Sequence, residues 1–243
     1  MRTNPNSEKA QNPSKIFAQW KDPGIFVYYD KEKAKNVELP SDFTFIVLGE
    51  FSTIKGWNDP SQSGIYSNEI RHIQTDILEV KAFKGGLIAK GTYGEISDQI
   101  KAAGGKFCSS VYVAYKSANG LELGNVQFTG ASLSSWFDFR KEHKADIYVK
   151  AVKLVGKLEA KKGATKYFMP VFEVVEISKE TDDKAGLLQD ELKAYHSEYF
   201  SSIPLDVESQ LDEEKTKIEQ QVEVMERNFK DTVLESSGSD LPF

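Results

Sequence analysis

The sequence predicts a mainly β protein, a barrel or a sandwich, followed by a helical region. Between residues 43 and 177, many short runs of β-branched and aromatic residues alternate with turn sequences rich in Gly, Asn and Asp. After residue 177 the apolar residues change to helical spacing. With 243 residues, of which 40% are hydrophobic, the chain is long enough for one large domain or two small ones.

The expected strands are short and follow one another closely. The first 15 residues are polar and are expected to be disordered. Strands are then expected at residues 43–51, 65–73, 77–83, 87–93, 106–116, 121–129, 146–159 and 166–177. The turn "SANG" makes a hairpin of the fifth and sixth strands. Pro170 indicates that the last strand lies at a sheet edge or carries a bulge.

Three segments have helical patterns. Residues 94–105 place Ile96 and Ile100 four apart and end near Gly104, so a short helix is expected there. Residues 132–144 form a second expected helix, with Ser132 as N-cap and Trp136 in the core. Residues 182–200 are also helical by pattern. An apolar stripe continues that pattern over about three heptads, at Leu211, Ile218, Val222, Met225 and Phe229.

These patterns divide the chain into four regions. They are a disordered N-terminus (1–15), a β-rich body (16–180), an acidic helical region (181–235) and a flexible tail (236–243). The net charge of −6 is unevenly spread, because residues 1–180 carry a net +4 and residues 181–243 a net −10. A mildly basic body with an acidic end is typical of nucleic-acid proteins with acidic tails, although a solvated acidic helix would show the same asymmetry.

No pattern predicts an enzyme, a cofactor or a metal site. The three histidines do not stand at metal-ligand spacing, and the single cysteine, Cys108, can build neither a zinc site nor an internal disulfide. The glycine-rich stretches match neither GxxxxGK[ST] nor GxGxxG, and GxSxG does not occur. Neither a secretory signal nor an apolar run of about 18 residues is visible, so no membrane association is expected and a cytoplasmic location is expected.

The expected strands interleave aromatic and basic residues. In residues 106–116, a period of two places Phe107, Val111, Val113 and Tyr115 on a core face. Tyr112 then lies on the other face between two lysines, an arrangement that suits single-stranded nucleic acid, since bases stack on rings and cations contact phosphates. The candidate binding residues are Trp57, Tyr66, Arg71, Lys81, Lys90, Tyr93, Lys106, Tyr112, Lys116, Lys150, Lys153, Lys166 and Tyr167.

The chain ends in "SSGSDLPF", with Asp240, Leu241, Pro242 and Phe243 at its tip. In this motif and in its layout the chain resembles bacterial and phage single-stranded DNA-binding proteins. That family typically has an OB-fold and an acidic C-terminal region that ends in Asp, a branched aliphatic residue, Pro and Phe. The resemblance implies an elaborated OB-fold barrel that coats single-stranded DNA in replication, recombination or repair. It also implies that the last four residues bind replication or recombination enzymes.

Two features depart from the bacterial pattern, and three questions stay open. The linker is short, and the acidic residues lie in a segment of helical pattern at 206–235. The resemblance therefore favours a phage-encoded protein in the host cytoplasm. The alternatives are an assembly protein with a C-terminal coiled coil, or a protein that binds single-stranded RNA. The sequence leaves the oligomeric state open.

Overall fold

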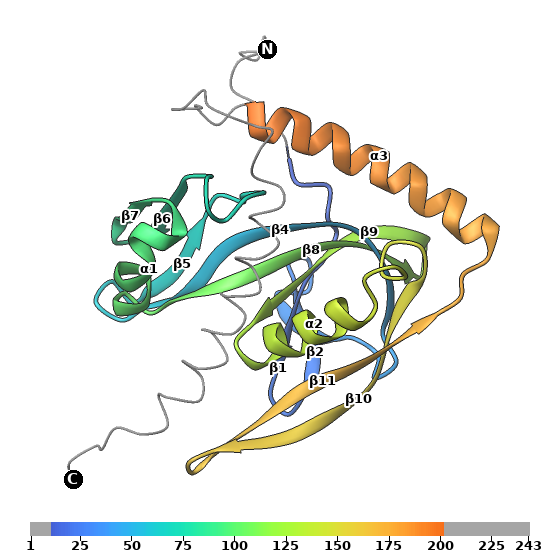
Figure 1. Cartoon of the computed structure of the whole chain (residues 1–243), viewed down its shortest axis with the longest axis horizontal. Helices are drawn as coiled ribbons and strands as arrows, with labels where there is room; N and C mark the ends of the chain where they lie inside the picture. The colour runs from blue at the N-terminus through green and yellow to red at the C-terminus, as the bar shows by residue number, and fades with distance from the viewer. Residues whose placement is uncertain (1–10, 202–243) are drawn as a thin grey trace.

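Residues 11–201 are described by a computed structural model, and they form one mixed sheet with three helices (Figure 1). The strands are β1 (Phe17–Lys21), β2 (Ile25–Asp30), β3 (Lys35–Glu38), β4 (Thr44–Asn58), β5 (Ser63–Ser67), β6 (Leu78–Ala82), β7 (Gly86–Gly91), β8 (Gly105–Ser117), β9 (Gly120–Thr129), β10 (Ala151–Lys162) and β11 (Thr165–Val175). The helices are α1 (Tyr93–Ala102), α2 (Ala131–Glu142) and α3 (Lys179–Ser201). The prediction of a mainly β chain with a few helices is confirmed.

Strand β4 organises the sheet because its 15 residues are long enough to pair with three other strands. One edge of β4 pairs with β8. The other edge pairs with β10 near the start of β4 and with β5 near its end. The sheet runs in the order β3-β2-β1-β9-β8-β4-β5-β6-β7, in which β1 is parallel to β9, and β10 forms a long hairpin with β11.

The main core lies on the inner face of this curved sheet, where α2 and β11 pack against it. Aromatic rings fill much of it, and the rings of Phe128 and Trp136 stack with their centroids 4.7 Å apart. The indole Nε1 of Trp20 donates a hydrogen bond of 2.9 Å to the carbonyl oxygen of Phe168. This contact joins β1 to β11, although no strand pairing connects the two within residues 11–201.

A smaller core lies where α1 packs on β5, β6 and β7. Ile96 and Ile100, the two apolar residues that predict α1, are both buried in it. Their buried neighbours are Ile54, Ile65, Ile70, Leu78, Val80 and Ala89. Gly104 follows the end of α1 with a φ of +91°, a left-handed conformation that glycine adopts without strain. The helix predicted at residues 94–105 is therefore confirmed.

Helix α3 lies across the outer face of the sheet (Figure 1). Its buried Ala185 and Leu192 pack against side chains of β4, β8 and β9, so the helix covers apolar positions on that face. The helix predicted at residues 182–200 is confirmed. The boundary expected at residue 180 does not separate α3 from the body, because α3 completes this part of the core.

Several expected boundaries are wrong. The strand expected at 65–73 ends at Ser67, after which an isolated bridge pairs Ile70 with Ser52. The strand expected to begin at residue 146 begins at Ala151, because the backbone before it forms hydrogen-bonded turns. Strand β4 continues to Asn58, well beyond the expected end at residue 51.

The capping and edge predictions have different outcomes. Gly130 holds the N-cap position of α2, whereas Ser132 is buried inside the helix and its Oγ donates to the carbonyl oxygen of Thr129 (2.9 Å). Ser132 is therefore not the N-cap. Trp136 is fully buried, as predicted. The edge position predicted from Pro170 is confirmed, because β11 pairs with β10 alone among the described strands.

Part of the expected N-terminal disorder is also wrong, because Lys15 donates its backbone N–H to the carbonyl oxygen of Leu123 (2.8 Å). Residues 1–10 and 202–243 lie outside the described part of the chain. The predictions for the acidic segment at 206–235, its apolar stripe and the tail at 236–243 fall there.

Candidate nucleic-acid interface

A row of lysines and one tyrosine crosses the outer face of the sheet beyond α3. The strand register places Lys106 of β8 beside Lys55 of β4, Lys55 beside Tyr66 of β5, and Tyr66 beside Lys81 of β6. Residues two apart on a strand point to the same side, so Trp57 and Phe83 belong to this surface too. We call it the open face, formed by Lys55, Trp57, Tyr66, Lys81, Phe83, Lys90 and Lys106.

The open face carries three aromatic rings, and two of them are in contact. Trp57 is 53% exposed and Phe83 is 72% exposed, which is unusual for rings of this size. The rings of Tyr66 and Phe83 stack with centroids 4.5 Å apart and planes 29° from parallel. Gly64 lies directly beside this pair, since a Cβ atom at residue 64 would lie 3.4 Å from the Phe83 ring. Together they form an aromatic platform of the kind on which bases stack.

The open face is not needed to build the core. The opposite side of β4, β5 and β6 carries Ile54, Ile65 and Val80, which pack against α1 in the smaller core. The rings and lysines therefore face outward without packing against α1. Exposed apolar groups surrounded by polar ones commonly mark a binding surface.

Positive charge dominates this surface. Among the described residues, Lys55 and Lys106 form no ion pair, so both ammonium groups remain available to an anion. Lys81 pairs with Glu79, and its hydrogen bond lowers the pKa of that carboxyl group. Lys90 lies opposite Glu79 in the register and lowers the same pKa through its charge. Glu79 thus offsets part of the charge of Lys81 and Lys90 and leaves Lys55 and Lys106 without an ion-pair partner among the described residues.

Tyr112 is not part of the open face, and its prediction as a base-stacking ring is wrong. The alternation predicted for β8 is confirmed, because Val111, Val113 and Tyr115 lie in the main core and Tyr112 points to the other side. That side is covered by α3 at this point of the strand, so Tyr112 has no exposed surface. The alternation in the sequence predicts on which face of β8 Tyr112 lies, but it does not predict that α3 covers this face.

A buried polar network explains why polar side chains lie beneath α3. The hydroxyl of Tyr112 donates to Oε2 of Glu69 (2.7 Å), and the hydroxyl of Ser110 donates to Oε1 (2.5 Å). Asn12 donates to the Tyr112 hydroxyl (2.7 Å), and Nε2 of His196 lies 3.6 Å from Oε2 of Glu69. Burial, with the nearby charge of Glu69, raises the pKa of Tyr112.

The other predicted residues lie away from the open face. Tyr93 packs edge-on against Phe107 in the smaller core, with ring centroids 5.5 Å apart, so it lies on the opposite side of the sheet. Lys116 is exposed, but it lies ten residues from Lys106 on β8, a separation of about 33 Å along a strand. These two lysines cannot flank one ring, as the sequence suggested.

A second set lies on or beside the projecting hairpin β10–β11 (Figure 1). Each of its three lysines forms an ion pair: Lys150 with Asp146 and Glu176, Lys153 with Glu173, and Lys166 with Glu159. The half-buried Tyr167 lies opposite Ala160 in the same hairpin. Because these three lysines are already paired with carboxylates, they are less available to an anion than Lys55 and Lys106 are.

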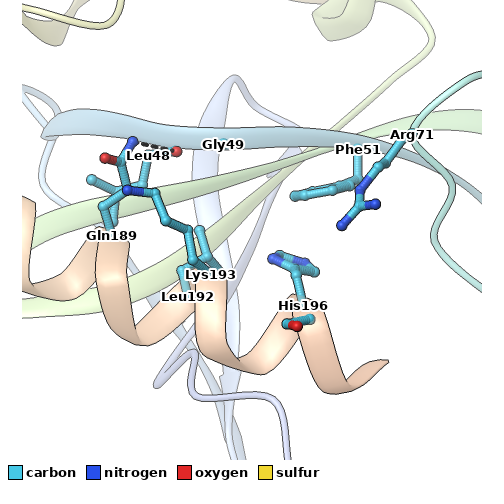
Figure 2. A pocket seen from close by; sticks show the side chains of 9 residues that line it. Leu48, Gly49, Phe51, Arg71, Gln189, Leu192, Lys193 and His196 are labelled. Carbon is cyan, nitrogen blue, oxygen red and sulfur yellow. Dashed lines mark hydrogen bonds between the residues drawn. The ribbon is translucent and has the colours of Figure 1, made fainter. Parts of the chain in front are cut away.

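Arg71 lies beside α3, at a cavity of about 290 Å³ between that helix and β4 (Figure 2). Its guanidinium carbon is 4.0 Å from the centroid of the Phe200 ring. Lys193 adds a second cation, while Leu48, Phe51 and Leu192 make part of the lining apolar. Gln189 closes one end by donating to the carbonyl oxygen of Leu48 (3.1 Å). Arg71 therefore belongs to this cavity.

The sequence predictions thus supply five residues of the open face: Trp57, Tyr66, Lys81, Lys90 and Lys106. Lys55 and Phe83 were missed. Both were visible in principle, because Lys55 lies two residues before Trp57 and Phe83 two residues after Lys81. Lys55 was missed because the expected strand ended at residue 51, whereas the alternation continues to the end of β4.

Within residues 11–201 no group of three or more His, Cys, Asp or Glu side chains is arranged to hold a metal ion. The same part of the chain contains no helix that is long and apolar enough to cross a membrane. In comparisons with known proteins, no family model, no curated protein and no solved structure matches this chain.

Proposed function

We propose that the protein binds single-stranded DNA without sequence specificity, through the open face. The observation that carries this proposal is the exposed group of Trp57, Tyr66 and Phe83 beside the lysines of neighbouring strands. Stacking of a base on such a ring is worth about 1–3 kcal/mol, and lysines attract the phosphates of any sequence. Duplex DNA hides the faces of its bases, so the rings favour single strands.

The strand order supports an OB-type barrel as the scaffold. Strands β4, β8 and β9 lie side by side and antiparallel, α2 follows β9, and β10 and β11 come last, with β10 returning to pair with β4. The aromatic core lies inside this arrangement, and the Trp20–Phe168 hydrogen bond joins β1 to β11. OB-folds bind oligonucleotides on an outer face of the barrel, with the help of adjoining loops.

In this proposal the protein coats single strands during replication, recombination or repair, as phage single-stranded DNA-binding proteins do. The tail at Asp240–Phe243 would recruit a replication or recombination enzyme, its phenyl ring entering an apolar pocket and its carboxylate meeting a cation. This second role rests on the sequence resemblance alone.

The test is a fluorescence titration of the full chain with oligo-dT, oligo-rU and duplex DNA at two salt concentrations. Oligo-dT should quench the exposed Trp57 and bind more tightly than duplex. Its log affinity should fall with log salt at a slope of about −0.7 for each phosphate neutralised. Equal affinity for oligo-dT and duplex would refute the proposal, whereas tighter binding of oligo-rU would identify RNA as the ligand.

Two variants assign the binding to the open face. Lys55→Ala and Lys106→Ala should each reduce the salt slope, because each removes an unpaired cation. Lys31→Ala serves as the matched control, since Lys31 is an exposed lysine in the turn between β2 and β3. A slope that stays the same in both open-face variants would place the DNA elsewhere.

A further inference from the structure

A hollow of about 180 Å³ lies where the open face meets the last turns of α3. Lys55 belongs both to this hollow and to the open face, so the two are continuous. Three rings contribute to the lining: Phe17 of β1, which is 41% exposed, and Tyr195 and Tyr199 of α3. Helix α3, which covers Tyr112, thus also forms one wall of this hollow, and the hollow itself is not covered.

The carboxylate of Glu69 disfavours a phosphate beside it inside the hollow. Glu69 lines it and carries a negative charge, which repels another anion at short range. Both carboxylate oxygens of Glu69 already accept a hydrogen bond, yet an ionised carboxylate has lone pairs for more. A neutral donor, such as a ring N–H or an amino group, can hydrogen-bond to these remaining lone pairs of Glu69 without charge repulsion.

Gln127 supplies the complementary group. Its Oε1 accepts a hydrogen bond from Gln19 (2.9 Å), and within residues 11–201 its side-chain amide makes no donor contact. The hollow therefore offers an N–H donor and a carboxylate acceptor among three rings. A flat aromatic group with donors and acceptors on its edge matches all of these features, and a nucleobase is such a group.

The size of the hollow agrees with this chemistry. A cavity of about 150 Å³ in a protein interior accommodates one benzene molecule. The present hollow, of about 180 Å³, thus has room for one six-membered ring with its substituents. It is too small for two stacked bases.

We propose that this hollow receives one base of the single strand that lies along the open face. The inference rests on the proposed function and extends it. Lys55 holds a phosphate at the mouth of the hollow, the base turns inward against Phe17, and its edge meets Glu69 and Gln127. The neighbouring nucleotides stack on Trp57 and Phe83, so α3 marks one end of the path of the DNA.

The test combines substitution with photo-cross-linking on the full chain. Phe17→Ala should weaken the affinity for oligo-dT about tenfold, and Phe17→Leu, which keeps the apolar contact but loses the ring, should weaken it nearly as much. Tyr29→Ala is the matched control, because Tyr29 is a 60% exposed ring on the neighbouring strand β2. Oligo-dT carrying 5-iodouracil should cross-link to a peptide that contains Phe17, Tyr195 or Tyr199.

The outcomes separate this inference from the function on which it rests. In one outcome, wild type binds oligo-dT and Trp57→Ala weakens that binding, but both Phe17 variants bind normally. If the cross-links then reach only residues of the open face, the hollow is not a base site. The proposed function would then stand. If wild type shows no preference for single strands, the proposed function itself fails. Phe17→Leu keeps the experiment decisive if Phe17→Ala does not fold.

Discussion

An aromatic ring on the outer face of this sheet has one of two roles, according to whether α3 lies above it. Tyr112 lies under the helix, has no exposed surface and uses its hydroxyl to bond Glu69. Tyr66, on the same face of a nearby strand, stacks on Phe83 beside solvent. The same residue type thus contributes to stability at one position and to the proposed binding surface at the other.

Phe83 gives the sharpest prediction at the scale of single residues. Because its ring is 72% exposed, Phe83→Ala should leave the free energy of unfolding almost unchanged. The variant should lose about 1–3 kcal/mol of affinity for oligo-dT, the usual contribution of one stacked base. Titrations of wild type, Phe83→Ala and the control Tyr29→Ala with oligo-dT measure this loss of affinity. An unchanged affinity in Phe83→Ala would remove Phe83 from the site.

Tyr112 gives the opposite prediction. Tyr112→Phe removes a hydrogen bond to a charged group, which should lower the free energy of unfolding by about 1.5–3 kcal/mol in urea. The affinity for oligo-dT should not change, since the ring is buried. A weaker affinity with unchanged stability would restore Tyr112 as a binding residue.

The pH dependence follows from the same contact. Burial raises the pKa of Tyr112 above that of an unfolded tyrosine, so the folded state keeps this proton more tightly. Stability from this group is therefore complete below about pH 10 and is lost as the pH rises further. Urea unfolding at pH 8 and pH 11 should show a smaller alkaline loss in Tyr112→Phe than in wild type. Equal losses would contradict this assignment.

At the scale of elements, α3 decides how much of the sheet is available. It buries Ala185 and Leu192 against the apolar part of the outer face and leaves Leu187 72% exposed on its other side. An amphipathic helix packs in this way because burial of apolar area is the main gain in free energy. The open face begins where this apolar contact stops.

Two leucines of α3 form a matched pair for testing this packing. Leu192→Ala should lower the free energy of unfolding by about 2–5 kcal/mol, because it leaves a cavity between helix and sheet. Leu187→Ala, on the exposed side of the same helix, should change it by less than about 0.5 kcal/mol. Urea unfolding of both variants measures these two changes in the free energy of unfolding. Equal effects would mean that α3 does not pack as described.

At the scale of the whole molecule, charge is divided between two ends of the chain. Residues 1–180 carry a net +4 and residues 181–243 a net −10. If the protein binds DNA as proposed, an acidic segment tethered to a basic surface would compete with DNA for it, and this competition would weaken as salt screens the charges. The tail would thereby link DNA binding to the recruitment of a partner.

The tail prediction separates these two roles. Phe243→Ala leaves every charge in place but removes a ring whose burial is worth roughly 1.5–3 kcal/mol. Its binding to a polymerase, helicase or recombinase of the same replication system should weaken about tenfold or more, with oligo-dT affinity unchanged. A chain that ends at Ser239 should fold normally and bind oligo-dT at least as tightly as wild type. Equal partner binding by wild type and Phe243→Ala would make the tail irrelevant to recruitment.

Local patterns in the sequence identified much of the fold. The period of two in residues 106–116 placed Val111 and Tyr112 on the correct opposite faces, and the spacing of Ile96 and Ile100 identified α1. These predictions hold because alternation and helical spacing follow from backbone geometry within one element. The interleaving of aromatic and basic residues likewise identified five of the seven residues of the open face, and it missed Lys55 and Phe83.

Contacts between distant segments decided the rest. Whether Tyr112 faces DNA or a helix depends on α3, which begins 67 residues later in the sequence, at Lys179. The grouping of Trp57, Tyr66 and Phe83 depends on the pairing of three strands, and the hollow at Phe17 on the meeting of β1, β4 and α3. Where the sequence predicted a strand or a helix, it determined which residues share a face. Only the tertiary structure decided which faces are covered, because burial is set by the apolar area that other elements bring to them.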